Sequence, residues 1–484
     1  MNVPIRRIIL VFGLLFLALL WNIEYVQVIQ AGSLSKRPDN RRVLLDEYSR
    51  ERGPILVGGD PIAQSVETKD ALVYQRKYAE GPRYGHITGF YSSIYGRTYL
   101  EESENPILAG TDNRLFVRRV IDLATGRAPQ GGSVLLTIDA RAQKAGDTAL
   151  GNKVGAVVAI EPKTGRILAM VSHPTYDPNK LASHSPSTQQ KAYQTYVTDP
   201  KNPMLNRATR QRYPPGSTFK LITAAAALSS GKGYTPTSML SSPKVLTVPQ
   251  TTHTIKNEND SSCGTTKAVL TVQQALAVSC NTTFAGLGMK VGANALRDQA
   301  EKFGFNSTPM NTFPDVASVF PQQLDVPETA LSSIGQYDVA ATPLQMAMVS
   351  AGIANDGQVM RPYLSAVVRG PDLRPISITR PQVMSQAVTP QVAAQLTQMM
   401  EAVVTSGTGK NGRITGVRVA GKTGTAQSSP DRPPYAWFTA FAPADNPQIA
   451  VAVVVEDSNT ARDDVSGGKL AAPVATAVMK AVLK

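Results

Sequence analysis

A serine precedes a lysine by three positions in segment 213–220, which reads YPPGSTFK. The two prolines and the glycine interrupt whatever comes before, and the apolar run 221–228 predicts a buried helix. Ser217 and Lys220 would then share one side of its first turn. Apolar surroundings disfavour the ammonium form, which lowers the pKa of a lysine and lets it accept a proton from the hydroxyl. Taken alone, a capping serine followed by a surface lysine is the more common arrangement.

Two further motifs follow in chain order, Ser-Cys-Asn and then Lys-Thr-Gly-Thr. We expect Ser279 to relay a proton towards a leaving amine, and Asn281 to hold the lysine and to donate to a substrate amide. If it stood alone, the Ser-Cys-Asn motif would be interpreted as a helix cap or a loop. The Lys-Thr-Gly-Thr motif alone would be interpreted as a plain turn. Together, in this order, the three motifs are the set known from serine β-lactamases and penicillin-binding proteins.

The last motif has the properties of a substrate-binding strand. Lys422, Thr423 and Thr425 offer a positive charge and hydroxyls to a terminal carboxylate. Gly424 has no side chain, so a substrate can lie along the strand edge as an added strand. The backbone N–H groups of Ser217 and Thr425 would form the oxyanion hole that acyl transfer needs.

The elements around these motifs predict an α+β fold, in which an antiparallel sheet is flanked by helices. Strands are expected first, helices in the middle and strands last. The expected strands are 134–139, 154–160, 167–172, 414–427, 436–441 and 449–456, and the expected helices are 140–150, 221–228, 272–277, 292–303, 343–354, 390–405 and 471–482.

The N-terminus predicts a membrane anchor. Arg6 and Arg7 precede an uncharged apolar run, 8–21, and the apolar character continues beyond it. A cleaved signal peptide is the alternative, but no clear small-x-small cleavage site follows the run. We therefore expect residues 1–30 to be a short cytoplasmic segment and a single transmembrane helix, with the rest of the chain outside the cytoplasm.

The remainder divides into two expected domains. Residues 31–130 are predicted to form a small, mostly β, non-catalytic domain, in which aromatic and β-branched residues favour a strand at 84–91. The similarity to penicillin-binding proteins implies that this domain is of the dimerisation or pedestal type. Residues 131–484 contain all three motifs, and the similarity of these motifs to those of penicillin-binding proteins implies that this part is a transpeptidase domain. A chain of 484 residues is long enough for such a division.

Composition excludes several classes of protein. The chain is 42% hydrophobic and 18% charged, with a net charge of +13. Because it carries no nucleic-acid motif, an anionic membrane or wall polymer explains this positive charge better than a nucleic acid does. Four scattered histidines and two cysteines offer no metal site at suitable spacing, and no cofactor is expected. Cys263 and Cys280 form either a disulfide or two buried free thiols.

The chain resembles the class B penicillin-binding proteins, and in its short length the actinobacterial A type. Besides the three motifs, the resemblance rests on Arg52-Gly53-Pro54-Ile55, Pro174 with Tyr176-Asp177-Pro178-Asn179, Ile334-Gly335-Gln336, Thr342-Pro343-Leu344-Gln345, and Gly467-Gly468 with Ala472-Pro473. It implies a D,D-transpeptidase that cross-links peptidoglycan stem peptides ending in D-Ala-D-Ala and that is acylated by β-lactams at Ser217. It further implies a membrane glycosyltransferase and cell-wall assembly proteins as partners, in division or elongation.

Three other functions compete with this expectation. A D,D-carboxypeptidase would use the same acyl-enzyme with water as acceptor, a β-lactam sensor would acylate and signal, and a scaffold would need no catalysis. A bifunctional class A enzyme is disfavoured because no glycosyltransferase-like domain precedes residue 130. A β-lactamase is disfavoured because no Glu-x-x-Leu-Asn segment lies between Asn281 and Lys422.

Overall fold

The structure is a computed structural model that describes residues 3–30, 47–115, 125, 130–257, 262–264, 268–428 and 432–484. The start of the expected N-terminal domain, 31–46, lies outside these ranges. Helix α1 (Val3–Glu24) continues into η1 (Tyr25–Ile29) as one apolar helix of 27 residues, none of them buried. Such a helix exceeds the hydrocarbon core of a bilayer, which is about 30 Å thick. Its length and composition fit a single-pass membrane anchor.

A five-stranded antiparallel sheet forms the centre of the large domain. Its strands come from the two ends of the expected transpeptidase region, as predicted. In spatial order they are β17 (Ala420–Ala426), β18 (Tyr435–Ala442), β19 (Ile449–Asp457), β7 (Val154–Ile160) and β8 (Ile167–His173). Every residue of β7 is buried, which its continuous apolar sequence explains. The strand that carries Lys422 is therefore an edge strand of a rigid sheet.

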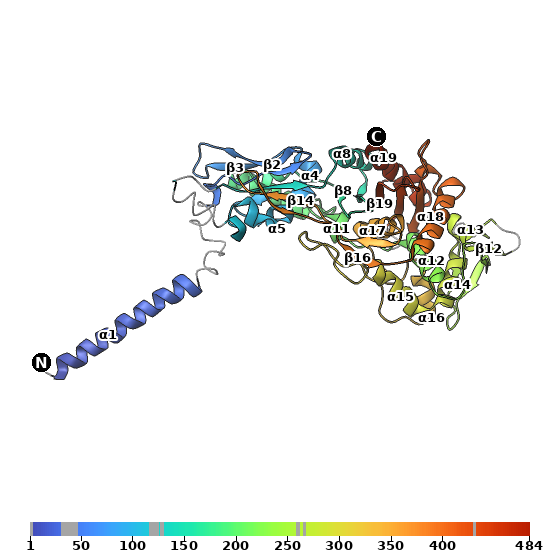
Figure 1. Ribbon diagram of the computed structural model, residues 1–484, viewed down its shortest axis with the longest axis horizontal. Helices are drawn as coiled ribbons and strands as arrows, with labels where there is room; N and C mark the ends of the chain where they lie inside the picture. Colours follow the sequence, from blue (N-terminus) through green and yellow to red (C-terminus); the bar gives the residue numbers. More distant parts are fainter. Residues whose placement is uncertain are drawn as a thin grey trace.

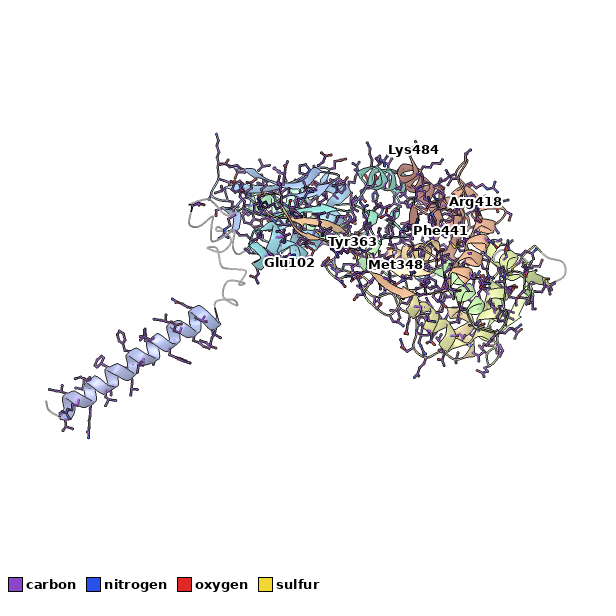
Figure 2. All side chains as sticks on the ribbon, viewed as in Figure 1. Glu102, Met348, Tyr363, Arg418, Phe441 and Lys484 are labelled. Carbon is purple, nitrogen blue, oxygen red and sulfur yellow. A yellow bond between two sulfur atoms is a disulfide. The ribbon has the colours of Figure 1, made fainter. Side chains whose placement is uncertain are left out.

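Helices cover both faces of this sheet (Figure 1). On one face lie α8 (Ala140–Leu150) and α19 (Ala472–Leu483), and on the other α12 (Lys220–Leu228), α17 (Pro343–Ala354) and α18 (Pro390–Thr405). Helix α17 is almost wholly buried. Met348 from this helix and Phe441 from β18 share one buried cluster, and Figure 2 labels both. On β17, Lys422 and Gly424 share the face that α12 and α17 cover, because they alternate in step with the buried Ala420 and Ala426.

A second sheet joins segments from both sides of residue 131. Its order is β15 (Pro375–Ile378), β14 (Ser365–Arg369), β6 (Ser133–Leu136), β1 (Ile55–Val57), β2 (Asp60–Glu67) and β3 (Tyr74–Tyr78). Strands β1 and β6 pair in parallel, with Ile55 opposite Val134. The N-terminal strands are thus continuous with strands that lie beyond residue 131.

The expected strand at 84–91 is wrong over most of its length. Residues Gly81–Thr88 form helix α4, and only Tyr91–Ser92 form a strand, β4. Pro82 lies in the first turn of α4, where its fixed φ favours a helix. The aromatic and β-branched residues that suggested a strand, such as Tyr84 and Ile87, are buried side chains of this helix.

The other elements are short and surround these layers. They are β5 (Gly96–Arg97), α5 (Tyr99–Ser103), α6 (Asn105–Leu108), η2 (Asn113–Leu115), α9 (Pro178–Leu181), α10 (Pro186–Thr198), α11 (Arg207–Arg210), β9 (Met239–Ser241), β10 (Val245–Thr247), β11 (Thr254–Lys256), β12 (Val269–Thr271), α13 (Val272–Ala277), α14 (Asn281–Val291), α15 (Ala293–Lys302), α16 (Val326–Ser332), β13 (Gln358–Met360) and β16 (Val383–Gln386).

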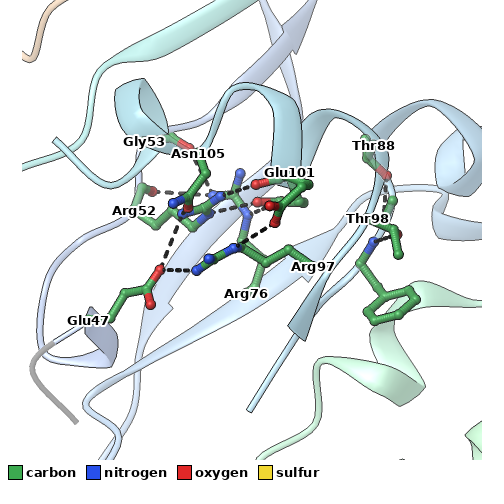
Figure 3. Close-up of polar contacts among 12 residues, drawn as sticks. Glu47, Arg52, Gly53, Arg76, Thr88, Arg97, Thr98, Glu101 and Asn105 are labelled. Carbon is green, nitrogen blue, oxygen red and sulfur yellow. Dashed lines mark hydrogen bonds and ion pairs between the residues drawn. The ribbon is translucent and has the colours of Figure 1, made fainter. Parts of the chain in front are cut away.

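Buried charges hold the N-terminal strands to the helices beside them (Figure 3). Arg52 Nε and Arg76 Nε donate to the two oxygens of Glu101 at 2.6 and 2.7 Å. Arg76 also donates to the backbone carbonyls of Arg52 and Gly53, at 3.2 and 2.9 Å. Burial alone raises the pKa of Glu101, but the two guanidiniums outweigh burial, so the pKa lies below its ordinary value. The carboxylate is therefore ionised at neutral pH.

Candidate active site

The serine of the first motif lies in a tight turn at the start of the central helix. Residues Gly216–Phe219 form a 3₁₀ turn, η3, which leads directly into α12. Gly216 has a φ of 52°, a conformation that side chains disfavour, and its N–H donates to Gly335 O at 2.9 Å. Ser217 is half-buried, whereas all but the last residue of α12 is buried. The hydroxyl therefore lies where a rigid, apolar helix begins.

The lysine of this motif is held by the Ser-Cys-Asn segment. Lys220 is fully buried, and its Nζ donates to Ser279 O at 2.6 Å and to Asn281 Oδ1 at 2.7 Å. It also lies 3.4 Å from Ser279 Oγ and 5.8 Å from the ring centre of Phe284. These contacts bring the first two motifs together around one amine.

The buried amine of Lys422 also contacts the hydroxyl of Ser279. Lys422 Nζ donates to Ser279 Oγ at 2.9 Å and to Thr423 O at 2.9 Å. Ser279 itself has a φ of 63°, a left-handed conformation that is uncommon outside glycine and is often found at functional sites. The Ser279 hydroxyl is thus the point at which all three motifs converge.

Strand β17 presents the rest of the third motif along the edge of the sheet. The Cβ that an alanine would add at Gly424 falls 3.0 Å from Pro215 O, so this strand packs closely against the segment before Ser217. Thr423 Oγ1 lies 2.5 Å from the hydroxyl of Thr408, a residue that the sequence did not single out. The two threonines place paired hydroxyls beside the Lys422 strand.

Aromatic and acidic residues that the sequence also missed support the serine turn. Trp437 Nε1 donates to Pro214 O at 3.0 Å, and the Tyr213 hydroxyl donates to Glu456 Oε2 at 3.0 Å. Burial, with Glu456 adding to its effect, raises the pKa of Tyr213 well above its ordinary value. Tyr213 therefore keeps its proton and cannot act as the base. No sequence motif marks these residues, because their partners lie far away along the chain.

The two cysteines are joined. Cys263 and Cys280 form a disulfide with their Cα atoms 5.7 Å apart. The disulfide links Cys280, the middle residue of the Ser-Cys-Asn motif, to Cys263 in the segment that follows β11. Among the residues that the structure describes, no group of three or more His, Cys, Asp or Glu side chains could hold a metal ion.

We predict that the disulfide is present in the mature protein. Closing a loop of this length stabilises a fold by roughly 3 kcal/mol in the chain-entropy model, and a non-cytoplasmic compartment favours oxidation. Protein purified without reductant and denatured in an alkylating reagent should therefore show neither cysteine alkylated by mass spectrometry. Prior reduction should expose both thiols. Alkylation of both before reduction would contradict the prediction.

The fold and the three converging motifs define the class of protein. Residues 155–480 match the penicillin binding protein transpeptidase domain, and residues 52–134 match the penicillin binding protein A dimerisation domain. The chain belongs to the family of penicillin-binding proteins with a transpeptidase domain, which confirms the resemblance seen in its motifs.

Individual relatives narrow this assignment. The chain is 46% identical to peptidoglycan D,D-transpeptidase PbpA of Mycolicibacterium smegmatis, across 100% of this chain and 99% of that protein. It is also 46% identical to PbpA of Mycobacterium tuberculosis, with the same coverage. The structure of penicillin-binding protein A from M. tuberculosis as a ceftriaxone acyl-enzyme complex matches with a TM-score of 0.87 at 46% identity, covering 91% of this chain and 100% of that one.

Proposed function

We propose that this chain is a peptidoglycan D,D-transpeptidase that forms an acyl-enzyme on Ser217 from stem peptides ending in D-Ala-D-Ala. One observation carries the proposal: Lys220 Nζ and Lys422 Nζ lie 3.4 and 2.9 Å from Ser279 Oγ, beside the serine turn. Two relatives named D,D-transpeptidase, each 46% identical to this chain over its full length, support the same reaction.

The first half-reaction transfers the donor peptide to the enzyme. Ser217 Oγ attacks the carbonyl carbon of the terminal peptide bond, while its proton passes to the amine of Lys220. The backbone N–H groups of Ser217 and Thr425 stabilise the oxyanion. The C–N bond then breaks, and the terminal D-Ala leaves as an amine that receives a proton through Ser279. An ester between Ser217 and the remaining peptide is left.

The substrate lies along β17 as an added strand. In this pose Lys422, Thr423 and Thr425 bind the terminal carboxylate, and Asn281 donates to the substrate amide. The narrow space at Gly424, where an added Cβ would lie 3.0 Å from both Pro215 O and Thr218 Cγ2, supports the need for glycine there. A side chain would separate the strand from the serine turn.

The second half-reaction forms the cross-link. An amine from a neighbouring stem peptide attacks the ester carbonyl, a new amide forms, and the Ser217 oxygen leaves and regains a proton. A β-lactam enters the same first step, since opening its ring acylates Ser217. Its leaving amine stays tethered in the opened ring, so the site remains blocked.

Product analysis separates this function from its closest competitor. The full chain in detergent is incubated with a stem pentapeptide ending in D-Ala-D-Ala, with and without a second stem peptide that carries a free side-chain amine. We expect a cross-linked product by mass spectrometry that lacks one D-Ala and depends on the acceptor. Tetrapeptide alone, at the same rate in both reactions, would instead identify a D,D-carboxypeptidase, and no product with stable penicillin labelling would favour a sensor.

We also propose an orientation for the anchor. The N-terminus would lie in the cytoplasm and residues beyond about 30 outside it. Arg6 and Arg7 lie near the start of the helix, before its uncharged run, and the cysteines are joined in a disulfide. Protease added to spheroplasts should degrade the large domain. A chain protected until the cells are lysed would reverse this orientation.

The domain division and the partners are proposals of the same kind. Residues 1–30 would form the anchor segment, 31–130 a non-catalytic domain and 131–484 the transpeptidase domain. Because β1 pairs with β6 across residue 131, the fragment 131–484 tests this boundary. A folded fragment that binds penicillin would support the boundary, and an insoluble fragment would place it elsewhere in the chain.

A membrane glycosyltransferase and other wall-assembly proteins are the proposed partners. Chemical cross-linking in cells should recover them together with the wild-type chain.

A further inference from the structure

Helix α14, which begins at Asn281, lacks a cap from its own sequence. The first N–H groups of any helix have no partner within the helix, and the residue before it usually supplies one through a side-chain oxygen. That position is occupied by Cys280, whose side chain makes no capping hydrogen bond and is bonded to Cys263. The cap of this catalytic segment must therefore come from elsewhere.

Asn257 supplies it from the segment that follows β11. Its Oδ1 accepts from the backbone N–H of Asn281 at 2.9 Å and from that of Thr282 at 3.0 Å. Its Nδ2 donates to Thr282 Oγ1 at 3.2 Å. The side chain is only 6% exposed. One buried amide thus fixes the first two residues of the helix, one of which is the asparagine of the motif.

The same segment determines how the Asn281 side chain is turned. Asn281 Nδ2 donates to the backbone carbonyl of Lys256 at 3.0 Å, which leaves Oδ1 facing Lys220 Nζ at 2.7 Å. A side-chain amide has one acceptor oxygen and one donor nitrogen, so satisfying the nitrogen at Lys256 directs the oxygen to the lysine. Residues 256 and 257 together set both the backbone and the side chain of Asn281.

We propose that Asn257 is a positioning residue for acyl transfer, acting through Asn281 on Lys220. The inference rests on the function proposed above and deepens it, since it assigns the geometry of the catalytic pair to a residue outside all three motifs. Within the described part of the chain, the amide of Asn257 bonds to Asn281 N and to Thr282, and so contacts the start of α14 rather than the reacting atoms. Its loss would let the start of α14 shift, and a displacement of about 1 Å in a catalytic group can cost on the order of a hundredfold in rate.

The test compares acylation rates of the full chain by benzylpenicillin. Asn257→Ala should lower the acylation rate constant about tenfold to a hundredfold. Asn257→Asp keeps the acceptor and should stay within about threefold of wild type, because a carboxylate oxygen also caps a helix N-terminus. If Asn257→Ala does not fold, Asn257→Ser, with its shorter side chain, replaces it, and the same loss is expected.

A matched control separates positioning from general stability. Asp139 Oδ1 also accepts two helix N–H groups, from Arg141 at 2.8 Å and Ala142 at 3.1 Å, but it caps α8 on the other face of the sheet. Asp139→Ala and Asn257→Ala should both lower the melting temperature by a few degrees, but Asp139→Ala should leave acylation within about twofold of wild type. An equal rate loss in both variants would overturn the proposal.

A double-mutant cycle completes the test. If Asn257 acts through Asn281, adding Asn257→Ala to Asn281→Ala should reduce the acylation rate by no more than about threefold further. Multiplied losses would overturn the positioning role, as would a wild-type rate in Asn257→Ala. A wild-type chain that is not acylated, or a Ser217→Ala variant that still is, would instead contradict the proposed function itself.

Discussion

Replacing Ser217 with alanine should abolish the covalent adduct that benzylpenicillin forms with this chain. The wild type should gain the mass of one intact benzylpenicillin, because the opened ring stays attached through the serine ester. The variant has no oxygen at this position, although Lys220, Ser279 and Lys422 keep their contacts with one another. We expect the acylation rate to fall by at least about a thousandfold, as loss of a catalytic nucleophile usually causes. Intact-protein mass spectrometry measures this directly.

Ser229→Ala is the control for this experiment. Ser229 is an exposed serine at the far end of α12, so its loss tests the effect of removing a hydroxyl from the same helix without touching the site. This variant should label like the wild type. An adduct that persists in Ser217→Ala would assign the nucleophile to another residue. Drug hydrolysed by the wild type without an adduct would instead indicate a β-lactamase.

The sequence predicted those parts of the fold that local pattern controls. Helices α8, α13, α17 and α18 begin and end at the expected residues. In α17 and α18 a threonine followed by a proline marks the start of the helix. Strands β18 and β19 were predicted within two residues. The expected strand 414–427 was too long: its first part is a turn closed by Ile414 and Val417, and β17 begins only at Ala420.

Helix α14 was not predicted, and its composition explains why. The segment Asn281–Val291 contains two threonines and two glycines, which are poor helix formers. One of them, Gly288, allows α14 to approach the end of α16, since an added Cβ would lie 2.2 Å from Ser333 Cβ. Tertiary packing therefore overrides local propensity here. The sequence alone cannot show which glycine serves such a contact.

In the candidate site, too, the sequence predicted the motif residues but not the residues that hold them in place. Motif order predicted that Ser217, Lys220, Ser279 and Lys422 act together, and their catalytic roles remain predictions. The residues that hold them, such as Asn257 and Thr408, belong to no motif. Their hydrogen bonds join segments whose proximity exists only after the sheet and helices have packed, so spacing along the chain does not reveal them.

Replacing Glu101 with alanine should destabilise the folded chain by about 3–5 kcal/mol, because the guanidiniums of Arg52 and Arg76 would stay buried without their shared carboxylate. Glu101 is fully buried, and the side chains of Arg52 and Arg76 are only 4% and 1% exposed. Typical domains are stable by only about 5–15 kcal/mol, so this loss should be plain in urea unfolding followed by circular dichroism. A surface ion pair offers the control: Glu401→Ala removes the partner of Arg418, whose side chain is 60% exposed, and should destabilise the chain far less than Glu101→Ala.

The stability of Glu101→Ala and of the wild type should also respond differently to acid. The pKa of Glu101 is lower in the folded chain than the ordinary value of 4.5, so the unfolded chain takes up its proton first as pH falls. The contribution of Glu101 is therefore complete above about pH 4.5 and is lost as pH falls through the folded-state pKa. Below pH 4.5 the free energy of unfolding should drop less steeply in Glu101→Ala than in wild type. Equal slopes in the two proteins would show that the carboxylate is not stabilised by its guanidinium partners, and the predicted loss of stability would then need a packing explanation.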